Sequence, residues 1–203
     1  MRKYIDIIRN KINSFQNNYV FISKDFISDV DYETVRKTLS RLCEKSEIKK
    51  ISRGYYYKPI YLSIINDYSK PDIDSYAKAI ARNMNWKIFP TGNTALNEFG
   101  LSTQVPSNYS YISSGRTISY EVDKIVILFT HRSSRETDFS YITGTVIQAL
   151  KAIGQDNITD EIINKISSRL LKEEKKLILL ESKNSSAWIY EVIKLICKGP
   201  QND

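Results

Sequence analysis

The sequence predicts an α+β protein with two domains: a small N-terminal domain of helices and a hairpin, and a mixed α/β C-terminal domain that ends in a helical segment. Three observations support this prediction. Apolar residues recur with helical spacing up to residue 46, a short basic stretch after Ile48 has the residues of two strands and a turn, and helical spacing returns in the last third of the chain. A chain of 203 residues is long enough for two small domains.

The N-terminal domain, residues 1–60, is predicted to contain three helices. Apolar residues at helical spacing mark the first of them: Ile5, Ile8, Ile12 and Phe15. Ser23 is a good N-cap and predicts a helix of about two turns behind it. Asp31 then starts a longer helix that extends to residue 46. We expect the three helices to pack together as the core of this domain.

The 31–46 helix is predicted to be amphipathic. Its core-facing side carries apolar residues and one cysteine: Val35, Leu39, Leu42 and Cys43. Its opposite side carries polar and basic residues: Tyr32, Arg36, Lys37, Ser40 and Arg41. One side of this helix is therefore expected to face solvent or a polyanionic partner.

A basic hairpin is predicted to follow the helix. Residues 49–52 form its first strand, Arg53-Gly54 its turn, and residues 55–58 its second strand. Pro59 has no N–H for a ladder bond, which suits a strand end. Helix, turn, basic helix and basic hairpin is the order of a winged helix-turn-helix domain, and such a domain binds DNA.

The distribution of charge supports this interpretation. Residues 1–60 carry 13 Lys and Arg against 7 Asp and Glu, a net charge of +6, whereas residues 61–203 have a net charge of only +1. Clustered positive charge beside a helix-turn-helix pattern is typical of nucleic-acid binding. The alternative is a basic face that is only solvated, because any surface helix has a charged side opposite an apolar one.

Particular residues are predicted to contact double-stranded DNA. The start of the 31–46 helix enters a major groove, where Arg36 can hold two acceptors of a guanine. Arg41 and the two hairpin lysines hold phosphates, and Arg53 reaches a minor groove from the hairpin tip. The full predicted set is Tyr32, Thr34, Arg36, Lys37, Arg41, Lys49, Lys50, Arg53 and Lys58. One such module covers few base pairs, so specificity needs two copies on an inverted repeat, through a homodimer or cooperative loading.

The remaining chain is predicted to form a linker, residues 61–71, and a C-terminal domain, residues 72–203. A short helix is expected within residues 62–68, and Asp72 or Asp74 caps a helix that opens the second domain. Residues 109–113 and 116–122 are predicted to pair as a hairpin around Ser114-Gly115, before a buried strand at 124–130. Helices are expected around residues 139–150, 159–170 and 188–196, whereas 175–180 is compatible with helix or strand.

Residue content argues against several other classes of protein. No apolar run approaches the roughly 18 residues of a membrane span, and the N-terminus has no apolar core of a signal peptide, so a cytoplasmic protein is expected. Cys43 and Cys197 are expected to be buried free thiols. Neither a metal-ligand spacing nor a phosphate-binding glycine loop is present, so we expect no metal site, cofactor or catalytic residue.

One enzymatic alternative remains open, a metal-dependent nuclease. Glu181-Ser182-Lys183 follows an apolar run, and a Glu-x-Lys pair can hold a divalent ion if another carboxylate comes close. Glu121 and Asp123 flank another predicted strand and are the candidates for that carboxylate. His131 follows the strand at 124–130, where a structural role or a phosphate contact is expected.

Four sequence blocks follow one another along the chain: Ile51 to Pro59 at the wing, Thr91 to Leu96, Gly100 to Pro106, and Ser114-Gly115-Arg116. In these blocks and their order the chain resembles the AbiEi-like antitoxins of abortive-infection systems. With the helical tail behind them, the resemblance extends over nearly the whole chain. It implies an N-terminal winged helix-turn-helix domain followed by a C-terminal α/β antitoxin domain.

The resemblance also implies a function. Proteins of this kind are the antitoxins of type IV toxin–antitoxin systems, and their N-terminal domain represses the operon by binding inverted repeats in its promoter. Their C-terminal domain counters a nucleotidyltransferase-like toxin, with or without direct contact. The alternative is a stand-alone winged-helix transcription regulator whose second domain senses a ligand or dimerises.

Overall fold

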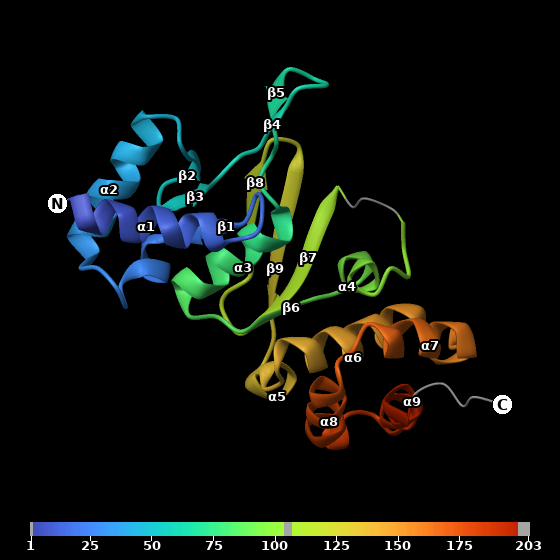
Figure 1. Cartoon of the computed structure of the whole chain (residues 1–203). Coiled ribbons are helices and arrows are strands. Elements are labelled where there is room, and N and C mark those ends of the chain that lie inside the picture. The colour runs from blue at the N-terminus through green and yellow to red at the C-terminus, as the bar shows by residue number, and fades with distance from the viewer. Residues whose placement is uncertain (1, 104–106, 199–203) are drawn as a thin grey trace. The chain divides into compact units, whose positions relative to one another are not determined.

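The computed structural model describes residues 2–103 and 107–198 and contains both helices and strands (Figure 1). The chain divides into two compact units, Met1–Asn85 and Trp86–Asp203. The predicted mixture of helix and strand is confirmed, as is the helical end of the chain.

The first unit contains three α-helices, one 3₁₀-helix and two small sheets in its described residues. In chain order these are α1 (Arg2–Ser14), β1 (Val20–Ile22), η1 (Ser23–Phe26), α2 (Tyr32–Glu44), β2 (Lys49–Ser52), β3 (Tyr55–Tyr57), β4 (Tyr61–Leu62), β5 (Asp67–Tyr68) and α3 (Ile73–Met84). Strands β1, β3 and β2 form one antiparallel sheet in that order, and β4 pairs with β5.

The predicted helices α1 and α2 are confirmed, but the segment that lies between them differs from the prediction. Asp31 caps α2, because its carboxylate accepts a hydrogen bond of 3.0 Å from the backbone N–H of Thr34. The segment behind Ser23 is a single 3₁₀ turn rather than a helix of two turns. It is held at its start by Asp25, whose carboxylate accepts the backbone N–H of Ile22 at 2.9 Å.

Strand β1 is the part of this unit that periodicity did not reveal. Its three residues are fully buried and pair with β3, so that Phe21 lies opposite Tyr56. Phe21 contacts the rings of Phe15 and Phe26 within the core that α1, η1 and α2 enclose. Three buried residues in a row do not alternate with polar ones, which removes the usual strand signal.

Helix α3 lies in the first compact unit, which ends at Asn85. The sequence instead predicts a linker at residues 61–71 and a second domain that begins at residue 72 with this helix. The helix is capped by Asp72, one of the two residues predicted for this role. Tyr76, Ala77 and Ile80 lie on its buried face.

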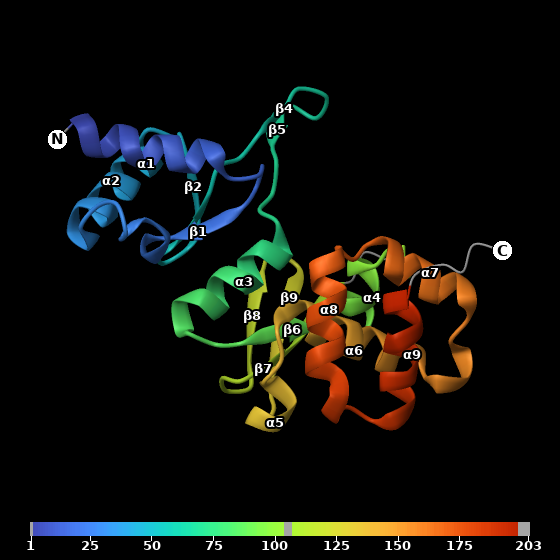
Figure 2. The same ribbon diagram turned by 60° about the horizontal axis from the view of Figure 1, so that its bottom comes forward.

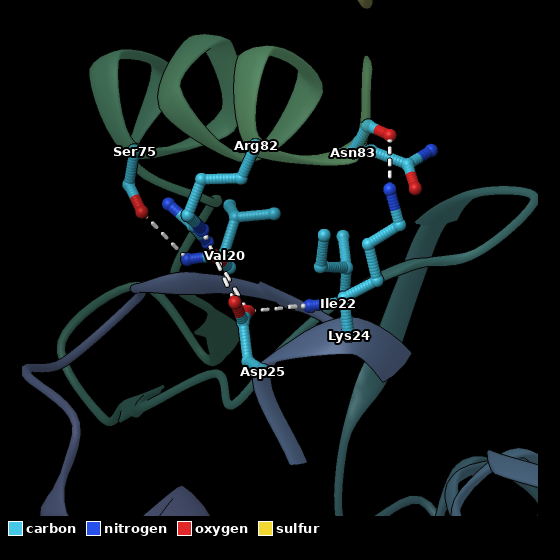
Figure 3. Close-up of polar contacts among 7 residues, drawn as sticks. All are labelled: Val20, Ile22, Lys24, Asp25, Ser75, Arg82 and Asn83. Atoms are coloured by element: carbon cyan, nitrogen blue, oxygen red, sulfur yellow. Dashed lines mark hydrogen bonds and ion pairs between the residues drawn. The ribbon is translucent and has the colours of Figure 1, made fainter. Parts of the chain in front are cut away.

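Polar contacts explain why α3 packs on β1 (Figure 3). Arg82 donates to the carboxylate of Asp25 at 3.1 Å and to the carbonyl of Val20 at 3.0 Å. The backbone N–H of Val20 donates to the hydroxyl of Ser75 at 2.8 Å in a buried position. Side chains of α3 thus supply hydrogen-bond partners to these groups. The bonds hold the helix against residues that lie more than fifty positions earlier in the chain.

The segment between β3 and α3 forms an exposed hairpin instead of the short helix predicted within residues 62–68. Tyr61 pairs with Tyr68 across β4 and β5, and their rings meet edge to face with centroids 5.4 Å apart. Asn66 takes a positive φ of 51°, which ends any helical turn there. Ile64 is 98% exposed, so its apolar side chain makes no core face that would stabilise a helix.

The second unit contains a four-stranded sheet and a set of helices. In chain order these are β6 (Ile88–Pro90), α4 (Asn93–Glu98), β7 (Asn108–Ser113), β8 (Ile118–Val122), β9 (Ile125–His131), α5 (Ser134–Thr137), α6 (Tyr141–Ile153), η2 (Gln155–Asn157), α7 (Asp160–Ser168), α8 (Lys172–Glu181), η3 (Ser182–Asn184) and α9 (Ala187–Lys198). The strands are ordered β6-β7-β9-β8.

The strand pairing in this sheet differs from the predicted hairpin around Ser114-Gly115. Strand β9 lies between β7 and β8, parallel to β7 and antiparallel to β8. The tight hairpin is β8–β9, where Val122 pairs with Ile125 and Asp123 supplies a positive φ of 55° in the two-residue turn. The predicted apolar strand is therefore interior to the sheet, although Leu128 on it is 37% exposed.

The helices of the second unit enclose a hydrophobic core, and Figure 2 shows α6, α8 and α9 packed together. Residues 143–150 of α6 are buried, and apolar residues of α7, α8 and α9 pack against them. The ambiguous segment 175–180 is helical, as part of α8. Ile178 and Ile193 are fully buried, so α8 and α9 each contribute one face to this core.

Candidate nucleic-acid interface

A groove of about 650 Å³ opens on the first unit. It lies between the exposed side of α2, the start of η1, the β2–β3 hairpin and the end of α3. Its lining residues are Ile22, Ser23, Lys24, Tyr32, Arg36, Lys37, Ser40, Lys50, Arg53, Gly54, Tyr56 and Asn83. The groove therefore gathers residues from six elements of one unit: β1, η1, α2, β2, β3 and α3.

The charge of this groove has one sign. Five of its lining residues are cationic: Lys24, Arg36, Lys37, Lys50 and Arg53. None of its described lining residues is acidic. A concave surface lined by one sign of charge concentrates the potential, so this groove attracts polyanions.

The structure brings together five of the nine residues that the sequence predicts to contact DNA. These are Tyr32, Arg36, Lys37, Lys50 and Arg53. On α2, the carboxylate cap at Asp31 sets the orientation of the first turn, and its hydrogen bond from the Thr34 N–H lowers the pKa of Asp31. Among the described residues, Arg36, whose side chain is 62% exposed, forms one ion pair, 3.8 Å from Glu33. Its guanidinium is available for a ligand at little cost.

The hairpin places the other two cations. Lys50 lies opposite Tyr56 in the register, and Arg53 with Gly54 makes the two-residue turn. Gly54 has a φ of +90°, a conformation that residues with a Cβ rarely adopt. The tight turn therefore holds Arg53 at the rim of the groove rather than on a mobile loop.

Four predicted contact residues lie outside this groove. Lys49 precedes Lys50 on β2 and points to the other face of the strand, where its ammonium lies 4.2 Å from the ring centre of Tyr68. Lys58 donates to the side chain of Asn13 at 2.7 Å. Thr34 is half-buried beside its cap, and Arg41 is exposed on the last turn of α2.

Sequence reasoning missed several groove residues, among them Lys24, Asn83 and Tyr56. The Lys24 ammonium donates to the backbone carbonyl of Asn83 at 2.6 Å, which joins η1 to the end of α3 (Figure 3). Burial raises the pKa of Tyr56, so its phenol stays neutral in the groove. No local pattern could have indicated Asn83, because it enters the groove only through the packing of α3 on β1.

Glu181, the central residue of the nuclease alternative, has hydrogen-bond partners within the fold. Glu181 ends a helix, and its carboxylate accepts the backbone N–H of Ser140 at 3.0 Å and the hydroxyl of Ser140 at 2.6 Å. His131 donates from Nδ1 to the carbonyl of Gly115 at 2.7 Å. Within the described residues, no three His, Cys, Asp or Glu side chains lie close enough together to hold a metal ion.

The Glu181 carboxylate is expected to stabilise the fold rather than to take part in catalysis. Burial raises the pKa of this carboxyl, but hydrogen bonds from Ser140 and Thr143 outweigh it, so the pKa is lowered. Because the pKa of Glu181 is lowered in the folded state, its ionised carboxylate stabilises the fold at pH values above the unfolded-state pKa of about 4.5. This stabilisation is lost as the pH falls through the pKa of the folded state. Glu181→Gln should thus lower the free energy of unfolding by about 1–2 kcal/mol at pH 7 and by less at pH 3.

Urea unfolding at the two pH values measures this difference, and Glu173→Gln, an exposed change on the same helix, is the matched control. An equal loss at both pH values would contradict the assignment. Loss of a Mg²⁺-dependent nucleic-acid cleavage in Glu181→Gln would instead support the nuclease alternative.

Comparison with known proteins adds one finding. A family model described as a family of unknown function (DUF6088) matches residues 7–178. None of the curated proteins matches the chain. The antitoxin family that the sequence resembles appears in neither result, so that resemblance stays a prediction, and its Gln104 to Pro106 lie outside the described residues.

One further absence concerns membranes. Over the ranges that the structure describes, no helix combines the length and the apolar character required to cross a bilayer.

Proposed function

Because this chain belongs to the DUF6088 family, whose function is unknown, we propose its function from its own residues: it is a transcription regulator that binds double-stranded DNA. The observation that carries this proposal is the groove of the first unit, with five cations and no described acidic residue. A DNA duplex carries one negative charge per about 1.7 Å of axis, so phosphates are the ligand that this charge fits.

The order of elements supports a winged helix-turn-helix domain in the first unit. α1, η1 and α2 enclose an apolar core, and the β2–β3 hairpin follows α2. In such a domain the exposed side of α2 enters a major groove and the hairpin tip contacts the neighbouring backbone or minor groove. Arg36 is then the residue for a guanine edge, while Lys37, Lys50 and Arg53 hold the backbone.

Salt dependence tests this proposal. If about four phosphates are neutralised, the logarithm of the binding constant should fall against the logarithm of salt concentration with a slope of about −3.6. Fluorescence anisotropy with a labelled duplex from the chain's own promoter measures the slope, and a scrambled duplex shows how much is sequence-specific. Absent binding, or binding that salt does not weaken, would rule the proposal out.

The resemblance to AbiEi-like antitoxins supports a more specific version. In it, the regulator represses its own promoter in the cytoplasm, and the second unit counters a nucleotidyltransferase-like toxin encoded beside it. Co-expression of the full chain with the neighbouring gene product tests this version, using variants that have lost DNA binding. Rescue without repression supports an antitoxin, whereas failure of the wild-type chain to rescue leaves a stand-alone regulator.

A further inference from the structure

A second groove, of about 460 Å³, lies wholly within the second unit between α8 and α9. Its floor is formed by Leu179, Leu180, Tyr190 and Cys197. Its rim carries three lysines: Lys183, Lys194 and Lys198. None of its described lining residues is acidic, so this groove combines an apolar floor with a cationic rim.

Contacts of α8 and α9 with the core of the unit, and with each other, fix the shape of this groove. Leu179 and Cys197 pack against the buried core of the unit. The Cys197 thiol donates to the backbone carbonyl of Lys175 at 3.4 Å, which joins the end of α9 to the first half of α8. Burial raises the pKa of Cys197, so the thiol stays neutral and adds to the apolar floor. The groove is thus part of the folded helix pair rather than a gap between loose segments.

Leu180 shows that the groove lacks an occupant within this chain's described residues. It lines the groove and is 63% exposed, whereas Ile178, two positions earlier, is fully buried. Removing an exposed leucine side chain from water is favourable, so an apolar side chain from a partner that covers Leu180 would gain free energy here.

The rim lysines determine the kind of partner. Because α8 and α9 run antiparallel, Lys183 in η3, just after α8, and Lys198 at the end of α9 lie at opposite ends of the groove. Helix α9 is about 16 Å long between its first and last residues, which corresponds to three turns of a partner helix. Lys194 already contacts Glu191 at 2.7 Å, but that glutamate is exposed and does not line the groove.

We propose that the α8–α9 groove binds an amphipathic helix of a protein partner, whose leucine-like side chains cover the apolar floor and whose acidic residues meet the three lysines. Helix-in-groove recognition uses apolar anchors spaced at i, i+4 and i+7, which match a groove of this length. The rim charge excludes basic helices and sets the orientation of an acidic one. This binding does not depend on the DNA-binding groove, because it uses residues of the second unit alone.

Defined peptides test the proposal on the full chain. The probe is a labelled helical peptide of about four turns with leucines at i, i+4 and i+7 and flanking glutamates. We expect saturable binding of this peptide and at least about 10-fold weaker binding of a version with lysine in place of each glutamate. Leu180→Glu should weaken binding of the acidic peptide at least about 10-fold, whereas Leu171→Glu, at an exposed leucine outside the groove, should not.

A charge-reversal variant distinguishes specific binding at this site from nonspecific binding. The double variant Lys183→Glu and Lys198→Glu should prefer the basic peptide, and both positions are exposed, so folding is expected to be retained. Equal binding of both peptides to the wild-type chain, no binding of either, or equal losses in Leu180→Glu and Leu171→Glu would overturn the proposal. Binding to vesicles of phosphatidylcholine and phosphatidylserine without binding of the acidic peptide would also overturn it, in favour of a membrane surface.

Discussion

Replacing Arg36, Lys50 and Arg53 together by alanine is expected to weaken binding to promoter DNA by about 100-fold or more. The three side chains come from α2, β2 and the hairpin turn, and all line the cationic groove. Each charged contact to a phosphate or a base edge contributes about 1–3 kcal/mol, so three losses amount to at least two orders of magnitude. The slope of binding against salt should become shallower by about 1.8, since the two phosphate contacts of Lys50 and Arg53 are lost while Arg36 contacts a base. Anisotropy titrations at several salt concentrations measure both effects.

A matched control comes from the same unit. Replacing Lys45, Lys49 and Lys58 by alanine removes the same charge, but none of these residues lines the groove. This variant should lose much less affinity, because only the general field of the domain changes. Two of these lysines, Lys49 and Lys58, are contacts that the sequence predicts and the groove does not contain. If the control loses as much affinity as the groove variant, DNA is held by the basic domain as a whole and not by this groove.

The second large effect is expected on stability, at Gly144, the fourth residue of α6. Alanine is normally favoured over glycine inside a helix by about 1 kcal/mol. Here a Cβ at Gly144 would lie 2.4 Å from the ring of Phe89 on β6, well inside contact distance. Phe89 is 1% exposed and packed on all sides, so its ring cannot move away freely. Overpacking of this kind costs about 1–3 kcal/mol or more, so Gly144→Ala should destabilise the second unit by about 2 kcal/mol.

Tryptophan fluorescence isolates this effect, because both tryptophans of the chain, Trp86 and Trp188, belong to the second unit. Urea unfolding followed at this probe gives the free energy of unfolding of that unit. Combining Gly144→Ala with Phe89→Leu should recover about 1 kcal/mol relative to the sum of the single changes, since the smaller side chain makes room. A stabilising effect of Gly144→Ala alone would show that helix propensity outweighs the steric overlap and that Phe89 on the sheet moves to accommodate the methyl group.

Helix positions and faces could be predicted from the sequence because they depend on nearby residues. Val35, Leu39 and Leu42 are buried as their spacing indicates, while Tyr32 and Arg36 on the same helix are exposed. The turn at Arg53-Gly54 was also predictable, since few residues other than glycine tolerate its φ. Part of the candidate site could therefore be predicted, because α2 and the turn at Arg53-Gly54 both place cationic side chains along the groove between them.

Pairing of strands could not be predicted in the same way. An apolar run such as β9 is compatible with any interior place in a sheet, and chain order favoured a β7–β8 hairpin. The observed order inserts β9 between those strands, and the turn that makes this possible lies at Asp123 rather than at Gly115. The burial of Phe129 against Tyr111 and Tyr120 accompanies this order, and those contacts join residues from three strands.

Most helices of this protein, the faces that they bury and the basic charge of its first sixty residues follow from local sequence. Contacts between distant residues place α3 in the first unit, bring Lys24 and Asn83 into the groove and leave Lys49 and Lys58 outside it. This difference arises because periodicity reports only which side chains share one face of one element. The choice of neighbouring elements depends on contacts between distant residues, such as Arg82 with Asp25, and these have no signature in any short stretch of chain.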